Sequence, residues 1–309
     1  MTVLVLTSEQ DVTADMVVAR LHERGVPLVR FDPGDLPGEG GLSAEYVRGE
    51  FRGYLSVGGR VVSMDGLRSI WIRRPSEPAA HADEPSEWLT AESGQALYGM
   101  LDCTTARWMN DPGAAAKARN KPWQLRLAHR SGFPVPATVI TTHPQVARQF
   151  AEQYRQVVVK SVSGKVPSDP PMALPTTLVP PDADFGGVAA GPTLLQRYIA
   201  KAADIRLTSV GDEWFAARKV SEPGQVDGRF GDTGHSWQPV EVPARIARAV
   251  ATYKNLAGLA YGAFDFAEDS EGTWWFLECN QGGQFGFVEL QTDQPIAEMV
   301  ASWLSVTEG

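Results

Sequence analysis

The chain has 309 residues, of which 43% are hydrophobic and 21% charged, and its formal net charge is −9. This is the composition of a folded protein with room for two or three domains, and it excludes disorder along the whole chain. The acidic balance argues against a broad nucleic-acid surface. There is no apolar run of membrane-spanning length, no signal peptide, and no disulfide or zinc spacing between the two cysteines. We therefore expect a cytoplasmic protein that binds neither nucleic acid nor membranes.

The first part of the chain has the pattern of an α/β domain. Residues 2–32 read as strand, helix and strand, and several short strands are expected over residues 42–74. Apolar residues then recur at helical spacing from Leu97 to Trp108, which predicts a core-packed helix. Proline and glycine interrupt the pattern directly afterwards. We place a domain boundary there and expect residues 1–112 to form an N-terminal α/β domain.

The middle of the chain places two lysines at the ends of predicted elements. Asn120 can cap a helix, which puts Lys121 at the helix start. A buried-looking strand of three valines ends in Lys160. Such a lysine is typical either of an exposed strand end or of a ligand site, and both readings stay open. The proline-rich residues 167–181 are interpreted as an irregular lid, within a central lobe over residues 113–195.

The last part of the chain predicts antiparallel strands. A strand over residues 193–199, a hairpin over 204–220 and a helix over 242–256 precede a second hairpin over 261–280. The turn of this second hairpin is acidic and ends in glycine, which is typical of a tight hairpin connection. We assign these elements to a C-terminal lobe, residues 196–309.

The second hairpin carries polar residues that suit a metal site. Its expected register places Asp265 opposite Phe276 and diagonal to Glu278, about 7–8 Å away. Because side chains alternate along a strand, Glu278 and Asn280 are expected on one face and Leu277 on the other. Carboxylate and amide oxygens suit a magnesium ion that carries nucleotide phosphates. Ordinary polar positions on a half-buried hairpin are the alternative.

The chain contains neither of the usual phosphate-binding loops, G-x-x-x-x-G-K-[ST] or G-x-G-x-x-G after the first strand. Charged candidates follow one another in a characteristic order instead. The segments that carry this order are Val157-Val158-Val159-Lys160, Asp204-Ile205-Arg206 and Glu278-Cys279-Asn280. Together they resemble the ATP-grasp ligases over roughly residues 113–290.

The resemblance implies an α/β ATP-grasp fold with an N-terminal pre-ATP-grasp lobe, and it implies roles for named residues. ATP would be held by Lys121 and Lys160, by a hinge formed by Gln196, Arg197, Tyr198 and Ile199, and by Asp204. Magnesium would be held by Asp265, Glu278 and Asn280. Arg206, Arg218 and Lys219 would place positive charge beside the transferred phosphoryl group. A surface ion pair is the commoner role of an isolated arginine, and it is the alternative for each.

Within that family the chain is most similar to the maturases of graspetides, the microviridin-type ω-ester and ω-amide macrocyclases. The segment Ile70-Trp71-Ile72-Arg73-Arg74-Pro75 resembles the paired-arginine strand of their first lobe. Val226-Asp227-Gly228-Arg229 resembles their Asp-aromatic-Arg segment, with glycine in place of the aromatic residue. The lid departs from the pattern, because prolines follow Ser163-Gly164-Lys165. The resemblance implies substrate contacts for Arg73, Arg74, Asp227 and Arg229.

The resemblance also implies an ADP-forming ligase that uses ATP and Mg²⁺ on a ribosomal precursor peptide with a leader and a core. An Asp or Glu side chain would become an acyl phosphate, which a Ser, Thr or Lys side chain would attack to form an ester or amide. The alternative enzyme is an ATP-grasp ligase that adds a free amino acid to a peptide or protein. A nucleotide-binding regulator without turnover and a kinase of the same fold are further alternatives. The sequence leaves a homodimer open.

Overall fold

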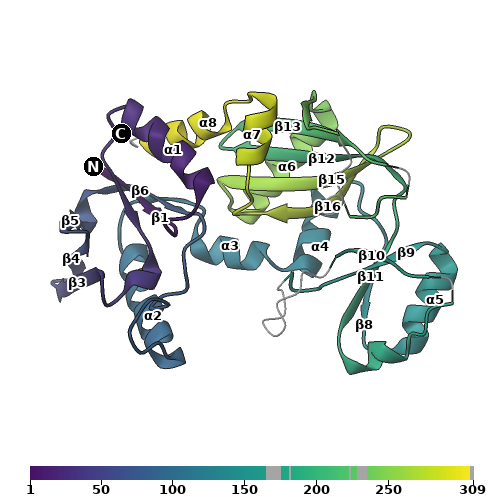
Figure 1. Ribbon diagram of the computed structural model, residues 1–309, viewed down its shortest axis with the longest axis horizontal. Coiled ribbons are helices and arrows are strands. Elements are labelled where there is room, and N and C mark those ends of the chain that lie inside the picture. Colours follow the sequence, from purple (N-terminus) through teal and green to yellow (C-terminus); the bar gives the residue numbers. More distant parts are fainter. Residues whose placement is uncertain (165–174, 181, 223, 228–234, 307–309) are drawn as a thin grey trace.

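The computed structural model describes residues 1–164, 175–180, 182–222, 224–227 and 235–306. Three regions of secondary structure follow one another along the chain (Figure 1). The first and the last share a long boundary, and a smaller central region lies below the last one in this view. The α/β fold expected from the sequence is confirmed. Among the described residues, no helix is long and apolar enough to cross a membrane.

A parallel sheet forms the N-terminal region, in the strand order β2-β1-β6-β7. Its inner strand β1 is a continuous apolar run because strands pair with it on both sides and helices cover it. The elements are β1 (Thr2–Leu6), α1 (Val12–Glu23), β2 (Leu28–Phe31), β6 (Leu67–Ile72), α2 (Glu87–Asp102) and β7 (Arg107–Met109). An antiparallel sheet of β3 (Gly40–Val47), β4 (Glu50–Val57) and β5 (Arg60–Ser63) is inserted between β2 and β6.

The helix expected to reach Trp108 ends earlier. α2 stops at Asp102, and Trp108 lies in β7, opposite Ile70 of β6. The apolar spacing was misleading because a short buried edge strand and one more helical turn place apolar residues at similar intervals.

A small antiparallel sheet forms the central region, in the order β10-β9-β11-β8. Its elements are β8 (Thr138–Thr141), α5 (Pro144–Tyr154), β9 (Val157–Lys160), β10 (Thr177–Leu178) and β11 (Thr193–Arg197). Ala147, Phe185, Val188 and Leu195 form a small core of its own between the sheet and α5. The expected lid falls largely on residues 165–174, which lie outside the described residues.

The C-terminal region is an antiparallel sheet in the order β14-β13-β12-β15-β16. Its elements are β12 (Lys201–Val210), β13 (Glu213–Val220), β14 (Gln238–Pro239), α6 (Ala244–Ala257), β15 (Tyr261–Asp269), β16 (Trp274–Asn280), α7 (Gly286–Thr292) and α8 (Ile296–Ser305). Both expected hairpins, β12–β13 and β15–β16, are confirmed.

Two helices from the start of the central segment pack against this C-terminal sheet. They are α3 (Pro112–Ala118) and α4 (Lys121–Ser131), and Leu127 of α4 shares a core with Tyr253 of α6 and Phe276 of β16. The N-cap of α4 is as expected, because Asn120 accepts a hydrogen bond from the Trp123 amide at 3.2 Å. The packing of α4 fixes where Lys121 points.

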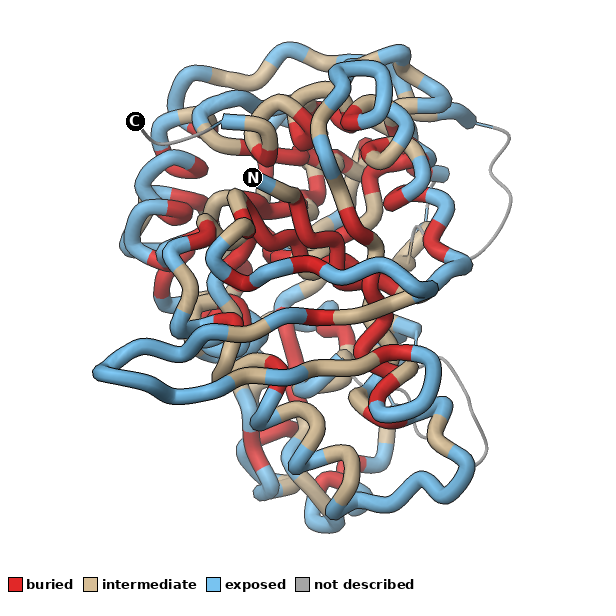
Figure 2. Tube along the Cα trace, turned by 90° about the vertical axis from the view of Figure 1, so that its left-hand side faces the viewer, coloured by how far each residue is buried: buried red, intermediate tan, exposed pale blue. Residues whose placement is uncertain are grey.

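One apolar core joins the N-terminal and C-terminal regions. Val5 and Trp71 of the parallel sheet share it with Ala263 of β15, with Val300 of α8, and with Phe285, which directly precedes α7. Figure 2 shows buried residues running through the centre of the molecule. The division of the chain after residues 112 and 195 stays a prediction.

Candidate functional site

A pocket of about 550 Å³ lies between the central sheet and the C-terminal sheet. Charged side chains from several elements line it. They include Lys121 from α4, Lys160 from β9, Asp204 and Arg206 from β12, Asp265 from β15, and Glu278 and Asn280 from β16. The sequence placed these residues in separate elements, and the fold brings them to one pocket.

The register of β15 and β16 differs from the expected one. A β-bulge next to Asp265 places this residue directly opposite Glu278, and not opposite Phe276 as the sequence predicted. The bulge inserts Leu277 without a partner on β15, because Phe276 pairs with Phe266. The two carboxylates are therefore direct cross-strand neighbours.

The bulge also changes which side chains share a face. Leu277 was expected on the face opposite Glu278, but both line the pocket. Cys279 points into the core: it is 1% exposed, and burial raises the pKa of its thiol. Asn280 returns to the pocket face, and its side-chain oxygen accepts a hydrogen bond from the Gly282 amide at 3.0 Å.

Arg206 is held directly against Asp265. Its Nη1 atom lies 2.6 and 2.7 Å from the two carboxylate oxygens, and its Nη2 atom donates to the Gln284 carbonyl at 2.9 Å. Burial raises the pKa of Asp265, and the arginine acts in the opposite direction. A fixed guanidinium thus lies at the wall of the pocket, and its place beside a transferred phosphoryl group stays a prediction.

Two lysines from other elements, α4 and β9, line the same pocket as these acids. The Lys121 Nζ atom donates to the Ser161 carbonyl at 3.0 Å and lies 3.7 Å from a carboxylate oxygen of Glu278. The Lys160 Nζ atom donates to Gln196 Oε1 at 2.9 Å. Burial lowers the pKa of Lys160 to about 8, with the nearby Glu278 acting against this shift. Lys160 therefore faces the pocket, and its role toward a nucleotide stays a prediction.

The predicted hinge is only partly directed at the pocket. Gln196 lines it, and its side-chain amide also donates to Thr138 Oγ1 at 2.9 Å. The amides of Arg197 and Tyr198 already donate to the carbonyls of Ala137 and Gln156, at 2.8 and 3.0 Å. Neither of these two residues, nor Ile199, lines the described pocket.

Asp204 is held by two neighbours at the pocket wall. Its carboxylate accepts from Lys201 Nζ at 2.6 and 2.8 Å and from Ser221 Oγ at 3.2 Å. Lys201 also lines the pocket. Lys201 was not predicted as a site residue, although its position three residues before Asp204, at the start of the same strand, is a signal for it.

Arg218 and Lys219 lie away from the described pocket lining. Arg218 pairs with Ile205 across the strands, and its Nε atom lies 2.5 Å from a carboxylate oxygen of Glu268. Side chains at this register position lie on the sheet face opposite Asp204 and Arg206, so the structure does not bring Arg218 to the pocket with them, and a place for it beside the phosphoryl group stays a prediction that this placement does not support. Lys219 is on the Asp204 face, since the two residues are cross-strand partners.

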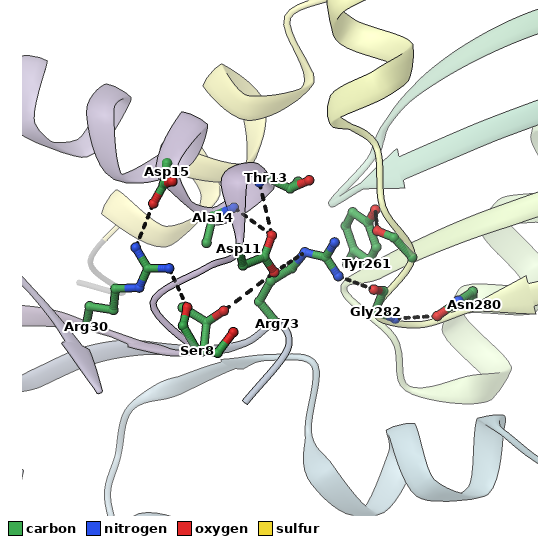
Figure 3. Close-up of polar contacts among 12 residues, drawn as sticks. Ser8, Asp11, Thr13, Ala14, Asp15, Arg30, Arg73, Tyr261, Asn280 and Gly282 are labelled. Atoms are coloured by element: carbon green, nitrogen blue, oxygen red, sulfur yellow. Dashed lines mark hydrogen bonds and ion pairs between the residues drawn. The ribbon is translucent and has the colours of Figure 1, made fainter. Parts of the chain in front are cut away.

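The paired arginines of the first region have different surroundings. Arg74 lines the pocket. Arg73 is 5% exposed and does not line it; its guanidinium lies between Asp11 and the Gly282 carbonyl (Figure 3). Protein groups surround the Arg73 side chain, so the structure does not bring it to the pocket with Arg74, and a substrate contact for Arg73 stays a prediction that this placement does not support.

The Asp-Gly-Arg segment is described only in part. Asp227 lines the pocket, and its carboxylate accepts from the Thr176 amide at 2.9 Å. Arg229 and Gly228 lie outside the described residues. The sequence analysis also missed apolar contributions to the pocket wall from Trp237 and Phe287, which no local pattern distinguishes from ordinary core residues.

The donor set fits a hard cation better than a transition metal. Among the described residues, no three His, Cys, Asp or Glu side chains form a group that could hold a metal. Two carboxylates and one amide at a pocket wall are instead the few oxygen ligands that magnesium takes when phosphates supply others. Lys121 and Lys160 add the positive charge that a polyphosphate needs.

Comparison with known proteins agrees with this geometry. Residues 2–115 match the family model of the MvdD pre-ATP grasp domain. No curated protein matches the chain. Macrocyclase MdnC from Microcystis aeruginosa MRC, solved with the precursor peptide MdnA, is 26% identical, with a TM-score of 0.87 over 99% of this chain and 100% of MdnC.

Two more distant structures show the same fold. A RiPP-associated ATP-grasp ligase from Chryseobacterium gregarium, solved with ADP, a leader and a core peptide, is 23% identical with a TM-score of 0.85, over 98% of this chain and 96% of that one. The ATP-grasp ligase PsnB, solved with a minimal precursor, Mg and ADP, is 21% identical with a TM-score of 0.78, over 98% and 96%. The resemblance that the sequence suggested is confirmed.

Proposed function

We propose that this chain, whose likeness to the ATP-grasp ribosomal peptide maturases extends over its whole length, is an ATP- and Mg²⁺-dependent carboxylate ligase. It activates Asp or Glu side chains of a ribosomal precursor peptide and joins them to Ser, Thr or Lys side chains as esters or amides. It is an ADP-forming enzyme. Addition of a free amino acid is less well supported, because MdnC is a macrocyclase.

One observation carries the proposal: the pocket joins two lysines and an arginine to two facing carboxylates. Lys160 comes from the central sheet and Lys121 from the start of α4, whereas Asp265, Glu278 and Arg206 come from the C-terminal sheet. A pocket of about 550 Å³ falls in the size range of small-molecule sites. Positive charge for phosphates and oxygen ligands for a divalent cation are thus present in one place.

The residue roles are part of the proposal. Lys121 and Lys160 would bind the phosphates, and Gln196, Asp204 and neighbouring hinge residues would hold the rest of the nucleotide. Asp265, Glu278 and Asn280 would hold magnesium, which supplies positive charge that offsets the charge on the phosphates. Lys219 and Arg229 stay predicted contacts. Asp227 and Arg74, which both line the pocket, are the candidates for the peptide side.

The chain's residues then have two tasks in the reaction. Arg74 would orient the carboxylate of the peptide, whose oxygen attacks the γ-phosphorus while the bond to ADP breaks. Arg206 would stabilise the negative charge that develops on the transferred group. In the second step a hydroxyl or amine of the peptide attacks the acyl carbon, loses its proton, and releases phosphate. The net change is loss of one water per linkage.

A precursor assay tests the proposal. The short open reading frame beside the coding sequence, if it encodes a peptide rich in Thr and Asp or Glu, supplies the substrate. Incubation with ATP and Mg²⁺ should remove the mass of one water per linkage and produce one ADP and one phosphate for each. A gain in mass equal to an amino acid would favour the alternative ligase, and a phosphorylated product would favour a kinase. A homodimer and a cytoplasmic location stay predictions.

A further inference from the structure

Four consecutive backbone carbonyls directly after the metal-site strand each accept a hydrogen bond from a different side chain. The carbonyl of Gln281 accepts from Asn110 at 2.9 Å, and that of Gly282 accepts from Arg73. The carbonyl of Gly283 accepts from Tyr261 at 2.7 Å, and that of Gln284 from Arg206 at 2.9 Å. An irregular segment normally leaves many carbonyls to water, so this one is held unusually firmly by the protein.

These donors come from both large regions of the fold. Asn110 and Arg73 belong to the N-terminal parallel sheet and its continuation, whereas Tyr261 and Arg206 belong to the C-terminal sheet. Asn110 is 3% exposed and also accepts from the Tyr261 amide at 2.8 Å. The segment after β16 is thus fixed against two sheets at once, and its position depends on how the regions are joined.

Arg73 and Arg206 are the charged members of this set, and of the two only Arg206 lines the pocket. The Arg73 side chain is 1% exposed, and its Nε atom lies 3.4 Å from Asp11, whose carboxylate caps α1 through the Thr13 and Ala14 amides at 3.0 and 3.2 Å. Burial lowers the pKa of Arg73, and Asp11 opposes this shift. A buried guanidinium is costly unless it is paired, so Arg73 is locked between the helix cap and Gly282.

The held segment reaches the metal site through Asn280. The Gly282 amide donates to Asn280 Oδ1 at 3.0 Å, and the carbonyl of the same residue accepts a hydrogen bond from Arg73 (Figure 3). Displacing Gly282 would therefore rotate the Asn280 side chain on the pocket wall. Partners that orient a ligand in this way set metal affinity as strongly as many direct contacts do.

We propose that Arg73 is a positioning residue of the ligase: it fixes Gly282, and through Gly282 the orientation of Asn280 at the nucleotide-bound metal. The inference rests on the proposed function, since Asn280 matters in this way only if it faces a metal. It differs from a substrate role for Arg73, which would require the guanidinium to reach the pocket. Arg74 alone of the pair does so.

The test compares Arg73→Met with a matched control, Arg68→Met. Arg68 lies on β6, which ends one residue before Arg73, and it also donates to a backbone carbonyl of the C-terminal region, that of Ser305 at 2.7 Å, away from the pocket lining. Both variants lose one arginine-to-carbonyl hydrogen bond between the same two regions. Only the loss at Arg73 should raise the Mg²⁺ concentration for half-maximal ATP turnover, by about ten- to hundredfold. Arg73→Lys should recover part of the loss.

A second measurement needs no turnover. Deuterium uptake by the peptide covering residues 277–290 should be faster in Arg73→Met than in the wild type, and unchanged in Arg68→Met. Equal uptake in all three proteins, or an unchanged Mg²⁺ requirement in Arg73→Met, would overturn the inference. A wild-type protein that consumes no ATP with its precursor would instead overturn the proposed function, while the exchange result would still decide whether Arg73 holds the segment.

Discussion

Arg206 donates to both carboxylate oxygens of Asp265, at 2.6 and 2.7 Å, and this ion pair joins the cross-strand partners of β12 and β15. The two side chains are 12% and 29% exposed. The arginine and the proposed metal would therefore share one carboxylate. Removing the charge of Arg206 or of Asp265 leaves the other side chain without its ion-pair partner.

We expect Arg206→Leu to lower the free energy of unfolding by about 3 kcal/mol, because Asp265 then loses its partner in a poorly hydrated place. Urea denaturation followed by circular dichroism measures the change. The double variant Arg206→Leu/Asp265→Leu should recover most of it. A double variant as unstable as the single one would show that the ion pair is not the cause.

Glu278→Gln should abolish ATP turnover while the protein stays folded. The substitution keeps the size of a side chain that is 43% exposed and removes one charge opposite Asp265. Turnover with precursor and the thermal midpoint are measured together, with Glu271→Gln in the exposed hairpin turn as the control. Wild-type turnover in Glu278→Gln would remove Glu278 from the proposed metal ligands.

Nucleotide affinity should fall as pH rises above about 8, where Lys160 loses its proton. A neutral amine no longer attracts phosphate, so the Kd for ADP with Mg²⁺ should increase by up to about tenfold per pH unit beyond that point. Titration calorimetry between pH 7 and 9.5 measures it. Lys160→Met should bind weakly at every pH and show a flatter profile.

The effect of Lys160 on stability has the opposite sign. Its pKa is 10.5 when unperturbed and about 8 in the folded chain, so between these values the unfolded chain holds more protons. Its contribution to the free energy of unfolding therefore rises with pH across this window. If wild type and Lys160→Met have parallel pH profiles for both affinity and stability, the shifted pKa is refuted.

Gly283→Ala should be harmful where Gly282→Ala is not. A Cβ atom on Gly283 would lie 2.5 Å from the Ala263 Cβ atom, whereas one on Gly282 would meet only the Arg73 carbonyl at 3.6 Å. We expect Gly283→Ala to cost about 1–3 kcal/mol of stability and to lower turnover, because the segment must shift away from Asn280. Denaturation midpoints of the two variants provide the comparison, and equal midpoints would contradict it.

The sequence predicted the local elements of the site well. A few adjacent residues determine a helix cap or a tight turn. The N-cap of α4 at Asn120 and the β15–β16 hairpin could therefore be identified directly. The resemblance then placed Lys160, Asp265 and Glu278 at one site, and the fold brings them to one pocket.

What the sequence could not predict depends on contacts between distant segments. The bulge at Leu277 is decided by how β16 packs, and strict alternation therefore assigned this residue to the wrong face. The local sequence also does not show that Arg73 is buried while Arg74 lines the pocket. Two adjacent arginines look alike until Asp11 and Gly282, from opposite ends of the chain, surround one of them.

The small central sheet has a core of its own, whereas the N-terminal and C-terminal regions share theirs. Opposite sides of the pocket thus belong to separately cooperative units, and the one with fewer buried apolar groups opens at lower free energy. On heating, the wall that carries Lys160 would melt before the wall that carries Glu278. A ligand that contacts both walls would couple their unfolding, so that the two transitions become one.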